Sequence, residues 1–344
     1  MGAFVYREAS GYGVFSADEV RLVWAYAADV VAEADLDLLV FALEMVYVPT
    51  GGFVVGDGSA GSGQFQAGGT TNDSFVVADK GSISLGDVAG RLSWTVDPGI
   101  IYAGNPGSPS GSTQASFPTG FQAFYVMKRQ VTQGEYVNFL NTLTQAQATV
   151  RHFAVTEWAS DRRHAITGYA VGAYGTSLPY VPHGFMRWAD SAAFADWAGL
   201  RPMTEFECEK AGRGPAMPVE LEFAWGGTDY ATVAGVVNAG TITERPTLEE
   251  ANIAWWGGVT DWLGFVRAGS FAAPGRSRER AGAGFYGVLD LSGEPGDWTV
   301  TVGNTAGQAF TGLHGDGSLS TGGLADVPSW PAADAAGAGS RGSL

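Results

Sequence analysis

The sequence predicts a loop-rich α+β fold with few helices and short antiparallel strands. Three observations support this class. Apolar alternation runs through residues 18–58, helix signals concentrate between residues 132 and 213, and helical periodicity is almost absent from residue 221 onwards. The 51 glycines and 11 tryptophans fit the same class, because glycine permits turn conformations and large aromatic side chains pin loops onto a core.

The strand signals lie mainly in the first 58 residues. Four strands are expected, around Val20–Trp24, around Leu38–Ala42, and at 45–48 and 53–55 on either side of a Pro-Thr-Gly-Gly turn. The Gly-, Ser- and Pro-rich stretches 56–74 and 103–120 are expected to be long loops within one domain, since strand-like segments flank both. We therefore divide the chain into a strand-rich N-terminal extension, 1–40, packed on a main domain, 41–344.

Helix starts are marked by capping boxes, in which a threonine and a glutamate three residues later satisfy each other's backbone amides. Thr132 and Glu135 open one helix, and Thr204 and Glu207 open a shorter one that ends near Arg213. Another helix is expected from Ala189 to Ala198. The apolar positions predict the buried faces, which consist of Tyr136, Phe139, Leu140 and Leu143 in the first helix and Ala193, Phe194 and Trp197 in the second of the three along the chain.

Charge excludes two classes of partner. The 344 residues carry 19 basic and 35 acidic side chains, a net charge of −16, so binding to nucleic acid or to an anionic membrane is not expected. Membrane insertion is not expected either, because Asp37 and Glu44 interrupt the most apolar stretch, 36–48. Residues 1–10 lack a basic region followed by an apolar core, so no standard signal peptide is recognised.

The single cysteine, Cys208, excludes an internal disulfide and a cysteine-based zinc site. We expect its side chain to be a small, buried apolar group. The four histidines, His152, His164, His183 and His314, show no close metal-ligand spacing, and we expect each to lie at the surface or to have its hydrogen bonds satisfied.

Three long motifs support a resemblance to a known family. They are 45–57 (MVYVPTGGFVVGD) followed by 127–140 (MKRQVTQGEYVNFL), then 188–214 (WADSAAFADWAGLRPMTEFECEKAGRG), and 286–293 (YGVLDLSG) running on to 310–317 (FTGLHGDG). In this order they resemble the formylglycine-generating-enzyme, or sulfatase-modifying-factor, family over residues 41–344. The resemblance implies a C-type-lectin-like fold of the formylglycine-generating-enzyme type.

The resemblance also bears on activity. Oxidases of this family bind copper through a pair of cysteines near the C-terminus, and related sulfoxide synthases bind iron through three histidines. One cysteine cannot form that pair, and the four histidines lack metal-ligand spacing, so neither copper nor iron is expected. The family pattern continues past the position of Leu344, and a cysteine pair would fall in that later part.

Stretches 40–49 and 310–317 resemble the non-catalytic branch, the variable proteins of diversity-generating retroelements. We therefore expect a ligand-binding display protein whose C-terminal face binds a protein or carbohydrate, on a cell surface, secreted or on a phage particle. A formylglycine-generating-type oxidase or related enzyme, and a structural or assembly protein, remain the alternatives.

Calcium is the one cofactor expected, in a structural role, because it takes carboxylate and carbonyl oxygens together. By resemblance, one loop would bind it through the side chains of Asp290 and Asp297 and the carbonyls of Gly293 and Pro295. A second family site would begin at Asn252-Ile253, with Asp261. In each case a turn closed by its own hydrogen bonds is the alternative.

The candidate ligand-binding residues are Trp298, Trp330, Ser340 and Arg341, since rigid aromatic rings beside small residues make good contact surfaces. Trp188, Trp197 and Trp225 are expected in the core, and Trp255-Trp256 could be either. Where the family has a buried tryptophan, this chain has Gly296, and Trp298 either fills that space or points outward.

Overall fold

The computed structural model describes residues 21, 40–59, 64–70, 72–94, 108–154, 156, 160, 162–254, 264–293, 295–332 and 338–341, the last four by their backbone alone. The chain divides into two compact units, Met1–Leu43 and Glu44–Leu344. Almost all of the first unit lies outside the described residues, so the extension 1–40 and its packing stay a prediction. Val40 and Ala42 are described, and they lie in neither helix nor strand, contrary to the strand predicted there.

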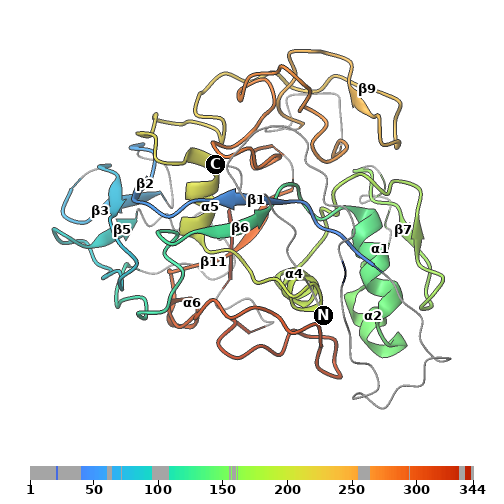
Figure 1. Ribbon diagram of the computed structural model, residues 1–344, viewed down its shortest axis with the longest axis horizontal. Coiled ribbons are helices and arrows are strands. Elements are labelled where there is room, and N and C mark those ends of the chain that lie inside the picture. The colour runs from blue at the N-terminus through green and yellow to red at the C-terminus, as the bar shows by residue number, and fades with distance from the viewer. Residues whose placement is uncertain are drawn as a thin grey trace. The chain divides into compact units, whose positions relative to one another are not determined.

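The second unit is an α+β structure built from short elements joined by long loops, which confirms the predicted class (Figure 1). The described strands form six two-stranded antiparallel sheets. Their pairs are β1 (Met45–Val48) with β6 (Phe124–Met127), β2 (Phe53–Val55) with β4 (Phe75–Val77), β3 (Phe65–Ala67) with β5 (Leu92–Trp94), β7 (Ile166–Thr167) with β8 (Gly175–Thr176), β9 (Val236–Val237) with β10 (Arg245–Pro246), and β11 (Asp297–Val300) with β12 (Ala338–Arg341).

The described helices are α1 (Gln133–Thr142), α2 (Gln145–Arg151), α4 (Trp188–Trp197), α5 (Glu205–Arg213) and α6 (Thr305–Gln308). All three predicted helices are present, and both predicted capping boxes form. Helix α2 was not predicted, although Thr144 and Gln147 make the same reciprocal cap at its start. None of the described helices is long and apolar enough to cross a bilayer.

The strands β1 and β2 form as predicted on either side of the Pro49–Gly52 turn, but they do not pair with each other. β1 pairs with β6 and β2 pairs with β4. The turn instead joins the loop that precedes β6, where Gly51 N donates to Phe121 O over 2.9 Å. The turn therefore connects two sheets rather than closing a hairpin.

Two apolar clusters make up most of the core. The larger one joins β2, β3 and β5 to α4, α5 and the C-terminal loops, and contains Phe53, Phe65, Trp94, Phe117, Trp188, Phe206, Val300 and Phe310. The other forms between α1 and α4, with Tyr136, Phe139, Leu140, Leu143, Ala193 and Phe194 buried and Trp197 packed at its edge. The predicted buried faces and the buried positions of Trp188 and Trp225 are thus confirmed, but Trp197, which was also predicted to lie in the core, is only partly buried. Trp255-Trp256 lies outside the described residues.

Helix α5 is buried although it is rich in charged residues. The Lys210 side chain is 1% exposed, and its ammonium donates to the carbonyls of Pro49 (2.7 Å), Gly51 (3.1 Å) and Gly120 (2.7 Å). Burial lowers the pKa of Lys210 to about 8, an effect that the nearby Glu207 opposes. At pH 7 the group is therefore still mostly protonated, and it holds the turn before β2 and the loop before β6 together.

Other charges on α5 have partners from nearby segments. Arg213 is paired with both Glu209 and Glu222, and Arg201 makes a two-point pair with Glu207, at 2.8 and 2.5 Å. The Glu205 carboxylate accepts the Val302 amide, at 3.0 Å. Buried charges are tolerated when they are paired in this way. The last of these contacts connects the start of α5 to the end of β11.

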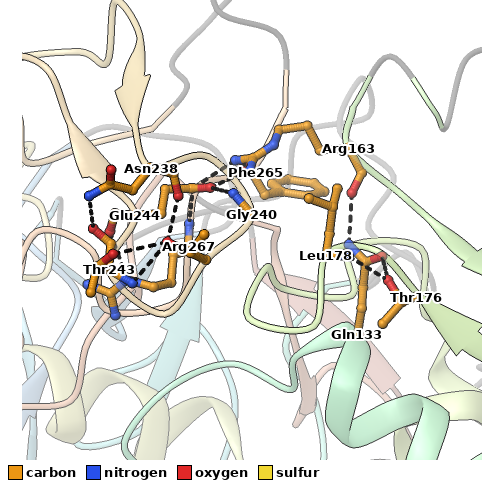
Figure 2. A network of polar contacts seen from close by, with 11 residues as sticks. Gln133, Arg163, Thr176, Leu178, Asn238, Gly240, Thr243, Glu244, Phe265 and Arg267 are labelled. Atoms are coloured by element: carbon orange, nitrogen blue, oxygen red, sulfur yellow. Dashed lines mark hydrogen bonds and ion pairs between the residues drawn. The ribbon is translucent and has the colours of Figure 1, made fainter.

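A second polar network lies around Glu244, which is fully buried (Figure 2). Its carboxylate accepts two hydrogen bonds from Arg163, at 2.9 and 2.5 Å, and one each from the amides of Gly240 (2.5 Å) and Arg267 (2.8 Å). Burial alone would raise the pKa of Glu244, but these donors outweigh it and lower the pKa. Through Gln133, whose amide donates to Arg163 O over 2.8 Å, the network reaches the first turn of α1.

Three histidines, His152, His164 and His183, lie close enough for each to affect the pKa of another. The rings of His164 and His183 stack with centroids 5.0 Å apart, and His183 also contacts Tyr136 at 4.4 Å. Among the described residues, His152 Nε2, His164 Nδ1 and His183 Nδ1 are buried without a hydrogen-bond partner. The expectation of surface or satisfied histidines is met only in part, since His164 Nε2 lies 3.2 Å from Phe153 O and His152 is half-buried, while one nitrogen of each ring is left without a partner.

We expect Lys210→Met to lower the free energy of unfolding by about 2–4 kcal/mol, because carbonyls that now accept from the ammonium would be left buried without a donor. Urea unfolding followed by tryptophan fluorescence measures the change. Lys128→Met is the control, since Lys128 is partly exposed and pairs only with Glu44 at the surface, so its loss should cost less than about 1 kcal/mol. Equal effects of the two substitutions would contradict the role assigned to Lys210.

We expect the histidine cluster to make the domain sensitive to acid. Burial, reinforced by the neighbouring imidazoles, lowers the pKa of His183 well below its usual value, and burial also lowers the pKa of His164 and His152. The unfolded chain therefore binds more protons than the folded one, so the contribution to stability is complete above about pH 6.5 and is lost as the pH falls below it.

The test compares unfolding free energies of the wild type and His183→Phe between pH 7.5 and 5. The variant keeps an aromatic ring but cannot titrate, so its stability should fall less steeply, by up to about 1.4 kcal/mol per pH unit. The contributions of other titrating groups to the unfolding free energy are the same in both proteins, so they cancel in the difference. Parallel pH profiles would refute the assignment.

Candidate functional site

The pairing of β11 with β12 brings together three of the four predicted ligand-binding residues. In the register of this two-stranded ribbon, Trp298 lies opposite Ser340 and Asp297 lies opposite Arg341. These pairs are more than forty positions apart in the sequence, and only strand pairing makes them neighbours. Three of the predicted ligand residues and one predicted metal ligand therefore share one β-ribbon.

The Trp298 side chain is half-buried. Its indole N–H donates to Met186 O over 2.8 Å, and its ring packs against the larger core cluster. Of the two orientations considered for Trp298, the structure shows the one that packs on the core. Gly296, in the place of the family's tryptophan, is exposed. The ring is therefore held in a defined position at the start of the ribbon.

Trp330 packs against the same cluster from the C-terminal loop. Its indole N–H donates to Leu313 O over 2.9 Å, and the preceding residue, Ser329, has a left-handed backbone conformation with φ of 69°. Ser329 and Thr311 share a hydrogen bond of 2.5 Å between their hydroxyls. Both candidate tryptophans are thus anchored on one core, with part of each side chain accessible.

The loop before β11 contains the first predicted calcium site. Asp290 is 3% exposed and has φ of 63°, a conformation that non-glycine residues rarely adopt. One carboxylate oxygen, Oδ2, accepts the Gly269 amide at 2.6 Å, while Oδ1 has no hydrogen-bond partner among the described residues. Burial raises the pKa of Asp290 to about 6, although the Gly269 amide and the charges of Arg267 and Arg129 oppose this.

Asp297 is electrostatically coupled to Asp290. Desolvation raises the pKa of Asp297 to about 7, the Asp290 charge raises it further, and a hydrogen bond from Gln130 opposes both. That bond runs from Gln130 Nε2 to Asp297 Oδ1 over 3.3 Å, and the same amide nitrogen donates to Pro295 O at 2.5 Å. Two neighbouring carboxylates that burial disfavours in their charged form suit a cation, which would stabilise both charges.

The backbone is closely packed at Gly293. Gly293 has φ of 76°, and a Cβ at this position would lie 1.9 Å from Ile253 Cγ1, so only glycine fits. Among the described residues, no group of three or more histidines, cysteines, aspartates or glutamates is placed to hold a metal ion. A cation here would therefore have two carboxylates and otherwise neutral oxygens, which is the mixed oxygen set that calcium takes.

The second predicted calcium site is already closed by internal hydrogen bonds at the residues described. Asn252 Oδ1 accepts the Ala231 amide at 2.8 Å, and its Nδ2 donates to Glu279 O at 3.1 Å. The Ile253 carbonyl accepts the Val233 amide at 3.1 Å. Asp261 lies outside the described residues. The alternative of a self-satisfied turn accounts for every contact seen at Asn252, and calcium at this position stays a prediction.

Two features of the structure, one in this site and one outside it, were not found from the sequence. Gln130 contacts the Asp297 loop from a position about 165 residues away, with no motif to connect the two, and the histidine cluster has no regular spacing. Cys208 is where it was expected, buried within α5.

The comparisons with known proteins agree with the family resemblance that the sequence motifs indicated. A model of the FGE-sulfatase family, the sulfatase-modifying factor enzyme 1-like domain, matches residues 42–324. A curated relative, the formylglycine-generating enzyme of Mycobacterium tuberculosis, is 32% identical over 112 residues, which cover 33% of this chain and 30% of the relative. Because the family model matches most of the chain, this protein belongs to the sulfatase-modifying factor enzyme 1-like family.

Proposed function

We propose that this protein is a non-catalytic member of its family that uses a C-type-lectin-like frame to present a binding face. The observation that carries the proposal is the β11–β12 ribbon, which gathers Trp298, Ser340 and Arg341, with Trp330 anchored on the same core. Its ligand would be a protein or a carbohydrate, since fixed, partly exposed indole rings offer a large contact area at little entropic cost. A protein with this role would work on a cell surface, outside the cell or on a phage particle.

The way the ribbon is attached supports this role. β11 is fixed at its end by Val300 N, which donates to Met203 O over 2.9 Å, and by Val302 N, which donates to Glu205. These are backbone and helix contacts that do not involve residues 338–341. Side chains along the ribbon could therefore differ between related proteins without disturbing the buried charges of α5 that hold the frame together.

Cys208 does not by itself supply a copper site. Cys208 is 3% exposed in the middle of α5, and the 344 residues contain no second thiol with which it could bind copper. The oxidase alternative draws its support from the name of the curated relative, a formylglycine-generating enzyme. The two hypotheses predict different behaviour toward copper and a different pattern of variation among related genes.

We further propose that the chain is of the retroelement-diversified type, and related copies of its gene test this. Substitutions should concentrate after codon 297, including codons 298, 330, 340 and 341, while codons 205–213 of α5 stay constant because they encode buried, paired charges. A nearby reverse-transcriptase gene with an adenine-rich near-copy of the C-terminal segment is expected. Sequencing the gene region in related isolates provides the measurement.

Two results would count against this function. Substitutions clustered in the codons of α5, or spread evenly along the gene, would contradict a diversified C-terminal face. Copper-dependent oxidation of a cysteine-containing peptide by the protein, expressed from its whole gene, would establish the oxidase instead. A fixed hetero-complex in light scattering, with the C-terminal face covered, would favour an assembly role.

For the loop 290–297 we propose a structural calcium ion, bound by Asp290, Asp297 and the carbonyls of Gly293 and Pro295. The supporting observation is the unpartnered, buried oxygen of Asp290 beside a second carboxylate. A bound ion would stabilise the start of β11, where Trp298 and the proposed binding face begin.

Calcium is therefore expected to raise the melting temperature. At a calcium concentration 100 times the dissociation constant, the gain in unfolding free energy is about 2.7 kcal/mol. Asp290→Asn and Asp297→Asn should abolish the shift, whereas Asp87→Asn, which alters an exposed carboxylate that accepts only the Gly69 amide in the structure, should leave it intact. Differential scanning calorimetry with and without calcium chloride makes the comparison, and a wild type indifferent to calcium would exclude the site.

A further inference from the structure

Gln130 meets the Asp290–Asp297 loop from another part of the chain. It lies just after β6, in a segment that runs alongside this loop, since Leu289 N donates to Lys128 O over 2.8 Å. The Gln130 side chain extends the contact, with Nε2 only 2.5 Å from Pro295 O and 3.3 Å from Asp297 Oδ1. It therefore touches two of the groups assigned above to calcium.

The orientation of this amide follows from its partners. Pro295 O and Asp297 Oδ1 are acceptors, so without a cation the amide must turn its nitrogen toward them. The other end of the amide, Oε1, is then buried without a hydrogen-bond partner among the described residues, as is Asp290 Oδ1. Two unpartnered buried oxygens in one small region are costly, since a buried acceptor without a donor destabilises the fold.

We propose that Gln130 is a further ligand of this site, and that its amide rotates when a cation binds so that Oε1 replaces Nε2 beside Pro295 and Asp297. In the cation-free protein the amide N–H groups provide partial positive charge to the two acceptors. A calcium ion provides that charge itself, and the amide oxygen then becomes one of its ligands. The rotation occurs about the last side-chain torsion of glutamine, whose energy profile is broad, so it requires no backbone movement.

In this arrangement the cation gains a metal ligand, Gln130, from outside the Asp290–Asp297 loop. A cation bound by Asp290, Gly293, Pro295 and Asp297 alone would be held within one segment of eight residues. With Gln130 it also joins the segment between β6 and α1 to the start of β11. The inference rests on the proposed calcium site, and the experiment is chosen so that the two can fail separately.

The test uses europium(III) as a luminescent substitute for calcium in the full chain, with calcium titrations by calorimetry in parallel. The luminescence lifetimes in H₂O and D₂O count the water molecules bound to the ion. Gln130→Ala should raise that count by about one, because water takes the place of the amide oxygen. It should also weaken calcium binding by roughly 10- to 100-fold, the range typical of lost supporting groups at metal sites.

Gln130→Glu is the matched variant, because it keeps an oxygen at the same position but removes the N–H donors. It should keep the wild-type hydration count and bind calcium at least as tightly. Without metal it should melt at a lower temperature than the wild type, because its carboxylate would face Asp297 and Pro295 O. Melting curves without metal confirm that each variant is folded before binding is measured.

The outcomes separate the two proposals. If the wild type binds neither calcium nor europium, the calcium site is wrong and the role of Gln130 falls with it. If the wild type binds but Gln130→Ala leaves the hydration count unchanged, the site stands and Gln130 acts only as a hydrogen-bond donor. An increase in hydration for Gln130→Ala, restored in Gln130→Glu, is the result that supports the inference.

Discussion

The fold of this protein depends on a charged helix placed in its interior. Helix α5 buries the Lys210 ammonium among backbone carbonyls that belong to the turn before β2 and the loop before β6. The two segments lead into strands of different sheets, and the ammonium joins them in addition to the backbone hydrogen bond from Gly51 N to Phe121 O. A buried charge without partners costs free energy, whereas one whose hydrogen bonds are all satisfied favours a single structure. The Lys210 ammonium thus favours the arrangement in which these carbonyls surround it.

The same helix determines where the candidate site lies. Its N-terminal end contacts β11 through Met203 and Glu205, so the strand that begins at Asp297 starts at a defined place beside the core. The Asp290–Asp297 loop precedes this strand directly. The residues that maintain the fold are the buried ion pairs of α5. The residues proposed to bind a ligand lie apart from them, on the β11–β12 ribbon and the Asp290–Asp297 loop.

Two groups of unpartnered buried polar atoms bear on the proposals, although Arg151, Ser270 and Asn304 also have buried side-chain atoms without a hydrogen-bond partner among the described residues. One is the imidazole cluster of His152, His164 and His183, and the other is the region of Asp290 and Gln130. The buried carboxylate of Glu244, by contrast, accepts hydrogen bonds from Arg163 and from the Gly240 amide. The unpartnered oxygen of Asp290 beside a second carboxylate is the observation on which the proposed cation rests.

Much of this could be predicted from the sequence because the signals are local. The capping boxes at Thr132 and Thr204 specify helix starts through contacts three residues apart, and the family motifs are continuous segments. Alternation identified β1 and β2 but not their partners, because pairing depends on contacts between distant segments. What only the tertiary structure decided was the placing of Trp298 opposite Ser340, of Gln130 against Asp297, and of three histidines in one cluster. Each of these results from long-range packing around α5 and the two core clusters, and no spacing within the sequence encodes it.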